Sequence, residues 1–201
     1  MTTPINSKNF FKQACIFEGS LIGIALALGW AGDINPFASL YFSETAFFHG
    51  IIATLPIFII FLALYQLNVK PLAKIRTLLL DMLGPILHRY HWSDLLILAS
   101  IAGISEEILF RGVIQPWMES SWGMLTGLIV SSLLFGLVHA VTLLYFLLAA
   151  LVSVYLGLLL DIEGSRNLLI PIVTHGLYDF LAFLVITHTY RRQNKTDTDH
   201  E

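Results

Sequence analysis

Long apolar segments alternate with short polar connections along almost the whole chain. Five of these segments come close to or exceed the length of about 20 apolar residues with which a helix crosses a bilayer. They run approximately from Ala14 to Ala31, from Thr45 to Leu67, from Met124 to His139, from Thr142 to Leu160 and from Leu168 to Thr187. The pattern predicts an all-α protein, a polytopic bundle of membrane-spanning helices.

Two further segments complete the predicted bundle. A long helix from about Ser93 to Glu119 is expected to make the sixth crossing, and residues 120–123 turn the chain back. The apolar stretch from Ile75 to Leu87 is too short to cross comfortably and is interrupted by Gly84 and Pro85. This stretch therefore predicts an interfacial helix.

Composition strengthens the membrane interpretation. Of the 201 residues, 56% are hydrophobic and 12% are charged, and the mean hydropathy is +0.76. A soluble domain carries about twice that charged fraction. The chain has no basic cluster with interleaved aromatic residues, so no nucleic-acid partner is expected. Its one cysteine, Cys15, excludes an intramolecular disulfide and a multi-cysteine metal site.

The positions of lysine and arginine predict the orientation. Lys8, Lys12, the basic residues of the 68–92 connection and those of residues 191–195 fall on one side of the predicted spans, whereas the other side has only Arg166. Because basic loops remain in the cytoplasm, both termini are predicted to be cytoplasmic, in a protein integral to the plasma membrane. The first apolar segment resembles a signal peptide, but this topology needs it as an uncleaved span.

One charged motif stands out within the long central helix. Glu106, Glu107 and Arg111 lie inside an apolar segment, where each charge costs roughly 2.5–3.5 kcal/mol at the centre of a span. Glu107 and Arg111 are four residues apart and can form an ion pair on one helix face. Glu106 lies about 100° further round the helix. The motif therefore offers one structural carboxylate and one that is free for chemistry.

Two more polar constellations fall within predicted spans. His139 follows Phe135 by four residues at the end of one span, and His175 precedes Asp179 by four residues within the last. Counted from the turns at about 1.5 Å per residue, these side chains reach nearly the same membrane depth as Glu106. We expect them to form one site. The remaining candidates, Glu18, His49, His188 and His200, are predicted to be structural or solvated.

A carboxylate beside two imidazoles and a second carboxylate suits hydrolysis of a peptide bond. Glu106 can act as general base on a water molecule. The imidazoles of His139 and His175 can orient that water, stabilise an oxyanion or bind a metal ion. The same residue types also serve proton relays and ion paths, so this alternative stays open.

The three motifs together resemble those of a known family. Glu106-Glu107-x-x-x-Arg111, Phe135-x-x-x-His139 and His175-x-x-x-Asp179 are similar to the signature of the CPBP intramembrane proteases. This family comprises the type II CAAX prenyl endopeptidases and the bacterial Abi proteins, which process bacteriocins or confer immunity to them. The resemblance covers about residues 93–187.

The resemblance implies a role for each motif residue. Glu106 would activate water together with His139, and His175 with residue 179 would stabilise the oxyanion. Glu107 and Arg111 would hold the site together. The family is commonly labelled as metalloproteases, which makes a divalent metal such as zinc a candidate cofactor, with His139 and His175 as candidate ligands.

The chain departs from the prenyl endopeptidases at one motif position. Residue 179 is Asp, where they have Asn. An ionised Asp cannot donate a hydrogen bond to an oxyanion. Asp179 could act in protonated form, orient His175 or ligate a metal.

The sequence thus predicts an intramembrane endopeptidase that acts on a membrane-associated peptide or protein. The substrate would resemble either a CAAX protein or a leader or bacteriocin peptide, and the lipid bilayer is the other expected partner. The alternatives are a non-catalytic bundle for bacteriocin immunity or peptide escort, and a small proton-coupled transporter. We divide the chain into N-terminal spans with the interfacial helix (1–92), a catalytic helical core (93–187) and a polar, disordered cytoplasmic tail (188–201).

Overall fold

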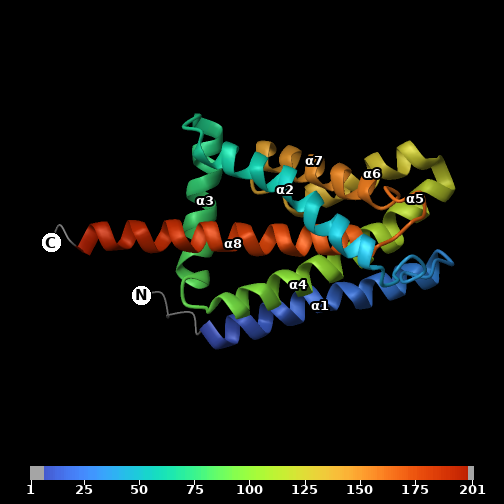
Figure 1. The fold of residues 1–201 in the computed structure, drawn as a ribbon, viewed down its shortest axis with the longest axis horizontal. Coiled ribbons are helices and arrows are strands. Elements are labelled where there is room, and N and C mark those ends of the chain that lie inside the picture. Colours follow the sequence, from blue (N-terminus) through green and yellow to red (C-terminus); the bar gives the residue numbers. More distant parts are fainter. Residues whose placement is uncertain (1–6, 199–201) are drawn as a thin grey trace.

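The computed structural model describes residues 7–198, and within this range every regular element is a helix (Figure 1). The elements in chain order are α1 (Ser7–Ala31), α2 (Glu44–Gln66), α3 (Lys70–Leu87), α4 (Trp92–Leu109), the π-helical segment η1 (Phe110–Ile114), α5 (Gln115–Trp122), α6 (Met124–Val138), α7 (Leu143–Leu159) and α8 (Leu169–Thr198). The predicted all-α bundle is confirmed. His200 lies outside the described residues.

Local capping signals explain where several helices begin. The side chain of Ser43 accepts a hydrogen bond from the Ala46 amide at the start of α2, and Thr142 caps α7 in the same way through the Tyr145 amide. These bonds satisfy amide groups that a helix leaves unpaired in its first turn. Gly123 separates α5 from α6 with a φ of 87°, which a residue without a Cβ adopts without strain.

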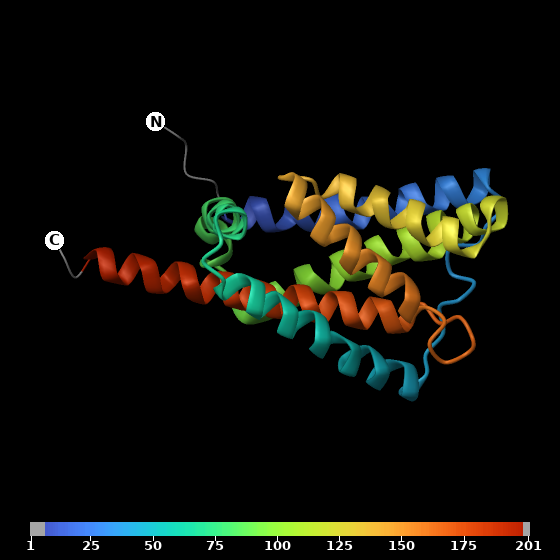
Figure 2. The same cartoon turned by 90° about the horizontal axis from the view of Figure 1, so that it is seen from above.

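The long helices run back and forth along one axis, and α3 crosses that axis. In Figure 1, α3 stands at right angles to the bundle, at the end where α1 begins and α8 projects outward. Figure 2 shows the same helix nearly end-on. This placement fits the prediction of an interfacial helix, because a helix in the membrane plane lies across the spanning helices.

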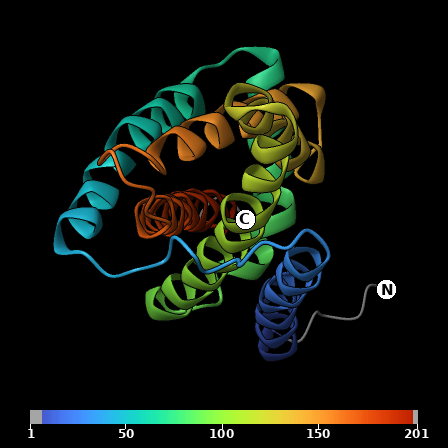
Figure 3. The same cartoon turned by 90° about the vertical axis from the view of Figure 1, so that its right-hand side faces the viewer.

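Helix α8 occupies the centre of the bundle. The view along the bundle in Figure 3 shows the other helices grouped around it, and α8 contacts α2, α3, α4 and α7. One apolar cluster joins α3, α4 and α8 through Leu80, Leu98 and Ile186. A second joins α1, α4 and α6 through Ala25, Ile108 and Phe135. Residues on α4 and α8 therefore face one another across the interior.

Three helices in the described part of the chain are long and apolar enough to cross a membrane. They cover Asn9–Ala31, Glu44–Gln66 and Leu169–Asn194, and the shorter apolar helices Met124–Val138 and Leu143–Leu159 accompany them. Together with the all-helical fold, these segments indicate an integral membrane protein. The α4–η1–α5 segment carries the charged motif and packs against α1, α6 and α8.

The structure corrects three details of the sequence prediction. Helix α8 continues to Thr198 instead of ending at Thr187, so residues 188–198 are helical and not a disordered tail. Helix α3 continues through Gly84 and Pro85 to Leu87. The central helix is broken by η1. The first two corrections share a cause, because Tyr190 of α8 packs against Gly84 and Arg191 donates a hydrogen bond to the His88 carbonyl.

The loop after α7 packs against the α5 end of the bundle, on the side opposite α3. Arg166 donates to Asp161 at 2.8 Å and to Glu119 at 2.7 Å. Its hydrogen bonds with Asp161 and Glu119 raise the pKa of the Arg166 guanidinium above its usual range, against a smaller opposing effect of burial. The loop therefore lies at the same end of the bundle as the turn after Glu119.

Helices α4 and α8 approach closely at two glycines. A Cβ added at Gly103 would lie 2.7 Å from the Gly176 nitrogen and 2.9 Å from its Cα. Real Cβ atoms do not approach backbone that closely, so only glycine permits this crossing. Glu107 lies one turn after Gly103, and His175 directly precedes Gly176. The contact therefore sets the distance between the charged motif and the last histidine.

We predict that Gly103→Ala lowers the melting temperature of the purified protein in detergent. The added methyl group must separate α4 from α8, and such overpacking costs about 1–3 kcal/mol. The control is Gly19→Ala on α1, where a Cβ meets nothing within 4 Å. That control should be neutral or slightly stabilising, because Ala is favoured over Gly in a helix. Equal melting temperatures for the two variants would contradict a close α4–α8 crossing.

Candidate active site

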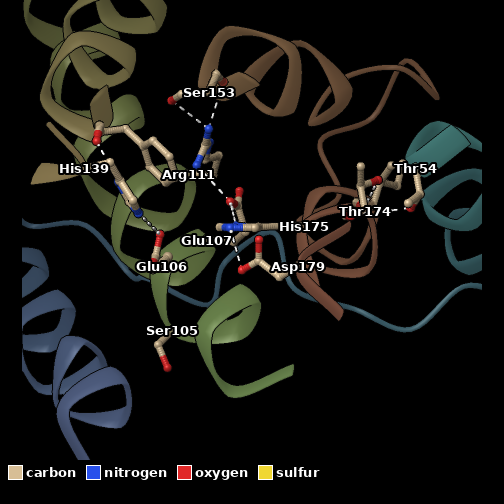
Figure 4. Close-up of polar contacts among 12 residues, drawn as sticks. Thr54, Ser105, Glu106, Glu107, Arg111, His139, Ser153, Thr174, His175 and Asp179 are labelled. Atoms are coloured by element: carbon tan, nitrogen blue, oxygen red, sulfur yellow. Dashed lines mark hydrogen bonds and ion pairs between the residues drawn. The ribbon is translucent and has the colours of Figure 1, made fainter. Parts of the chain in front are cut away.

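The two adjacent glutamates of α4 point in different directions (Figure 4). Glu107 faces His175 of α8, and Glu106 faces His139 at the end of α6. The helical rotation of about 100° between neighbours produces this separation. Glu107 is fully buried, and Glu106 is 8% exposed.

The Glu107 carboxylate is held by two donors. Arg111 Nη1 donates to Glu107 Oε1 at 2.8 Å, and His175 Nδ1 lies 2.8 Å from the same oxygen. Because an ionised carboxylate only accepts hydrogen bonds, the His175 ring nitrogen is the donor. The predicted ion pair between Glu107 and Arg111 is confirmed. The bond to His175 was not predicted.

Arg111 connects the charged motif to α7. Its Nη2 donates to both the carbonyl and the hydroxyl oxygen of Ser153, each at 2.8 Å. The guanidinium also lies over the Phe135 ring, 5.1 Å from its centroid, which adds a cation–π contact. A fully buried guanidinium needs such a set of partners, because an unpaired charge in the interior is very costly.

The π-helical segment η1 contains Arg111. A π turn adds a residue relative to the α-helix and re-aims the side chains that follow, which is why such turns occur often at functional sites. Within η1, Gly112 has no room for a Cβ beside the Pro36 carbonyl. The connection between α1 and α2 therefore packs directly against this turn.

Glu106 and His139 form the second contact of the site. His139 Nε2 lies 3.7 Å from Glu106 Oε2, and His139 Nδ1 lies 2.9 Å from the Phe135 carbonyl. Since a carbonyl only accepts, Nδ1 carries the proton that this bond needs, and Nε2 is the nitrogen directed at the carboxylate. Glu106 Oε2 is buried and has no hydrogen-bond partner among the described residues. It is thus available to a molecule that enters the site.

His175 lies between two carboxylates. Its Nδ1 contacts Glu107, and its Nε2 lies 3.5 Å from Asp179 Oδ2, one helical turn further along α8. A protonated ring can donate on both sides in this position. The predicted proximity of His175 and Asp179 is confirmed.

The Phe135 ring links the two halves of the site. It stacks on His139 with a centroid distance of 4.4 Å and meets His175 edge-on at 5.8 Å. Phe110 of η1 packs against it at 5.0 Å. This aromatic group therefore contacts both imidazoles and the Arg111 guanidinium.

The structure brings together all six side chains that the sequence singled out, which are Glu106, Glu107, Arg111, His139, His175 and Asp179. Sequence reasoning missed Ser153, whose only signal was a small polar residue in an apolar span. It also underestimated Glu18, whose Oε2 is buried and whose charge interacts with Glu106 and Asp179.

The donor set does not fit a resident metal ion. Among residues 7–198, no group of three or more His, Cys, Asp or Glu side chains is arranged to hold one. A catalytic zinc site normally has three protein ligands. His175 already contacts Glu107 through Nδ1, and the remaining ring nitrogens face one carboxylate each, His139 Nε2 facing Glu106 and His175 Nε2 facing Asp179.

Comparison with known proteins gives one match. Residues 88–181 match the family model described as type II CAAX prenyl endopeptidase, Rce1-like. The matched segment includes all three polar motifs and all six side chains of the site. No curated protein and no solved structure matches the chain.

We predict that Ser153→Ala destabilises the protein by about 1.5–3 kcal/mol, the range for a hydrogen bond to a charged group. The control is Ser131→Ala on α6, an equally buried serine that only donates to the Leu128 carbonyl of its own helix. Its loss should cost about 1 kcal/mol or less. Thermal unfolding in detergent measures both. A larger loss for Ser131→Ala would mean that Ser153 does not anchor Arg111.

Proposed function

We propose that this chain is a glutamate-dependent intramembrane endopeptidase, on the premise that residues 88–181 match the family model of Rce1-like type II CAAX prenyl endopeptidases. The observation that supports the proposal is that the two neighbouring carboxylates, Glu106 and Glu107, differ in their hydrogen-bond partners. Glu107 Oε1 accepts from Arg111 and His175, whereas no donor among the described residues holds the Glu106 carboxylate, which faces His139 at 3.7 Å. Each of the two carboxylates has one buried oxygen without a partner among the described residues.

Glu106 is the general base in this proposal. The distance of 3.7 Å between its Oε2 and His139 Nε2 is longer than a direct hydrogen bond. We therefore place the reacting water where it contacts both groups. Glu106 takes a proton from that water as the water oxygen bonds to the scissile carbonyl carbon. It then returns the proton to the departing amine nitrogen, so that the base is regenerated.

His175 stabilises the developing oxyanion in this mechanism. Glu107 accepts from Nδ1 and fixes the ring, which leaves Nε2 to face the reacting carbonyl. Asp179, 3.5 Å from Nε2, positions the ring and favours a proton on that nitrogen. Preorganised donors of this kind lower the barrier because they need not reorient during the reaction. Arg111 contributes by holding the Glu107 carboxylate in place.

The substrate in this proposal is a membrane-associated peptide or protein. The site lies within the helical bundle near the end covered by α3, and the Lys and Arg pattern of the sequence assigns that end to the cytoplasm. We therefore propose cleavage close to the cytoplasmic face of the plasma membrane.

We predict that Glu106→Gln reduces cleavage by 10²-fold or more, because the amide cannot accept the proton from water. Folding should be retained, since the buried side-chain oxygen of Glu106 makes no hydrogen bond within the described chain. The measurement is quantitative proteomics of membranes from cells with the wild-type chain or with Glu106→Gln. A peptide whose processing disappears in the variant identifies the substrate.

Glu107→Gln is the matched variant, one residue away. It leaves the buried Arg111 charge without its carboxylate, and breaking such a pair costs about 3–5 kcal/mol. We expect a large drop in melting temperature for Glu107→Gln and none for Glu106→Gln. Near-normal processing by well-folded Glu106→Gln would contradict the enzyme proposal and favour a non-catalytic role in immunity or peptide escort.

We predict different outcomes for two substitutions at Asp179. Asp179→Asn should remain active, because the amide oxygen can still accept a hydrogen bond from His175 Nε2 and position the ring. Asp179→Ala should lose about 10²–10³-fold in turnover, the usual cost of losing one group of an oxyanion site. Turnover of the identified substrate by purified protein measures both. Stoichiometric zinc in the wild-type protein, lost together with activity in Asp179→Asn, would overturn this assignment.

A further inference from the structure

One carboxylate outside the segment that matches the family model lies within a membrane-spanning helix. Glu18 of α1 is the only charged residue between Lys12 and Asp33 in the sequence. A carboxylate persists in such a place when it is paired or when it serves a function. The six side chains of the site come from α4, η1, the end of α6 and α8, so Glu18 is a candidate contribution from a further helix.

Glu18 interrupts the apolar inner face of α1. The residues of α1 that pack towards the bundle recur every three or four positions, as in an amphipathic helix. They are Phe11, Ala14, Cys15, Leu21, Ile22, Ala25 and Leu28. Glu18 is the position of this series that is not apolar, whereas Ile16 and Phe17, which precede it, are exposed on the outer face. Glu18 is therefore on the face of α1 that packs against α4.

The neighbouring turns of α1 locate Glu18 along α4. About one turn before Glu18, Cys15 packs against the apolar cluster that contains Leu98 of α4. One turn after Glu18, Ile22 packs against the cluster that contains Ile108. Glu18 thus lies between these two levels of α4, where the charged motif begins.

The electrostatic surroundings of Glu18 agree with this placement. Its charge interacts with the carboxylates of Glu106 and Asp179 and with the imidazoles of His139 and His175. The Glu18 Oε2 atom is buried and makes no hydrogen bond within the described chain, although the residue as a whole is half-buried. Each of the two imidazoles already faces a carboxylate of the site. Glu18 therefore adds a negative charge beside the site and has an oxygen that can accept a hydrogen bond from an incoming molecule.

We propose that Glu18 is a specificity-determining residue that binds a basic side chain of the substrate, a lysine ammonium or an arginine guanidinium, near the scissile bond. This inference rests on the proposed function. A cation beside a half-buried carboxylate is attracted more strongly than in water, because the surroundings are less polar. A charge-assisted hydrogen bond would also give Glu18 Oε2 a partner.

The proposal implies a preference that depends on charge and not on bulk. Lysine and norleucine have side chains of similar length, and only lysine is charged. At the position that reaches Glu18, a lysine peptide should bind about tenfold or more tightly than its norleucine counterpart, because a hydrogen bond between charged groups contributes about that much.

The test measures binding to the Glu106→Gln protein, so that no peptide is cleaved and the charge of Glu106 does not contribute. The protein is held in phosphatidylcholine nanodiscs, whose lack of net charge keeps basic peptides from collecting on the bilayer. The probes are N-myristoylated dodecapeptides in which one lysine is moved from position to position, each paired with the norleucine peptide. Fluorescence anisotropy gives the two dissociation constants at each position.

Two further substitutions in the Glu106→Gln protein assign the preference. Glu18→Gln keeps the size of the side chain and removes its charge, so the lysine peptide should lose its advantage. The norleucine peptide should bind as before, which shows that the protein remains folded. The control is Glu44→Gln, which removes an exposed carboxylate at the start of α2, at the end of the bundle opposite α3, and should leave the preference unchanged.

Four results would overturn the role of Glu18. They are no binding of any peptide, no position that prefers lysine, a preference that Glu18→Gln leaves intact or Glu44→Gln also removes, and an equal loss of both peptides in Glu18→Gln. The last result would show that Glu18 supports the fold and does not select the substrate.

The outcomes separate Glu18 from the proposed reaction. A lysine preference that requires Glu18, with no cleavage of any probe by the wild-type protein, would contradict the peptidase and keep a binding site for basic peptides. Cleavage of the lysine and norleucine peptides by the wild-type protein with equal kcat/KM at every position would keep the peptidase and overturn the role of Glu18.

Discussion

The buried ion pair between Glu107 and Arg111 constrains the rest of the structure. Neither charge has access to water, so the pair depends on partners within the protein, and Glu107 Oε2 is the carboxylate oxygen that has none among the described residues. Ser153 supplies two acceptors from α7, and His175 supplies a donor from α8. Three helices that are distant in sequence are thereby held in a fixed relation. Burial of this ion pair costs free energy, and the contribution of the pair to the structure is the fixed arrangement of these helices.

This anchoring leaves Glu106 able to act. One helical step separates it from Glu107, yet the two carboxylates have different surroundings, with two hydrogen-bond donors on one and the His139 ring facing the other at 3.7 Å. Phe135 stacks on His139 and contacts Arg111. A structural carboxylate and a reactive one can thus be neighbours on the same helix.

Helix α3 joins the membrane interface to the site. Its inner face packs on α8, where Gly84 receives the Tyr190 ring and lets α8 continue beyond the bundle. Leu79 and Met82 of the same helix line a cavity of about 240 Å³ whose wall includes His139. A single helix thus packs on the outer half of α8 and also borders the space beside His139.

The sequence by itself determined the helical class, the approximate spans and the partners within one helix, because hydrophobic periodicity and spacing of four residues are local properties. The Glu107–Arg111 pair was predictable for that reason. Contacts between helices were not, since they depend on rotation and crossing distance. Only the tertiary structure, through the Gly103–Gly176 approach and the π turn, decided that His175 bonds to Glu107 and that α7 supplies the partner of Arg111.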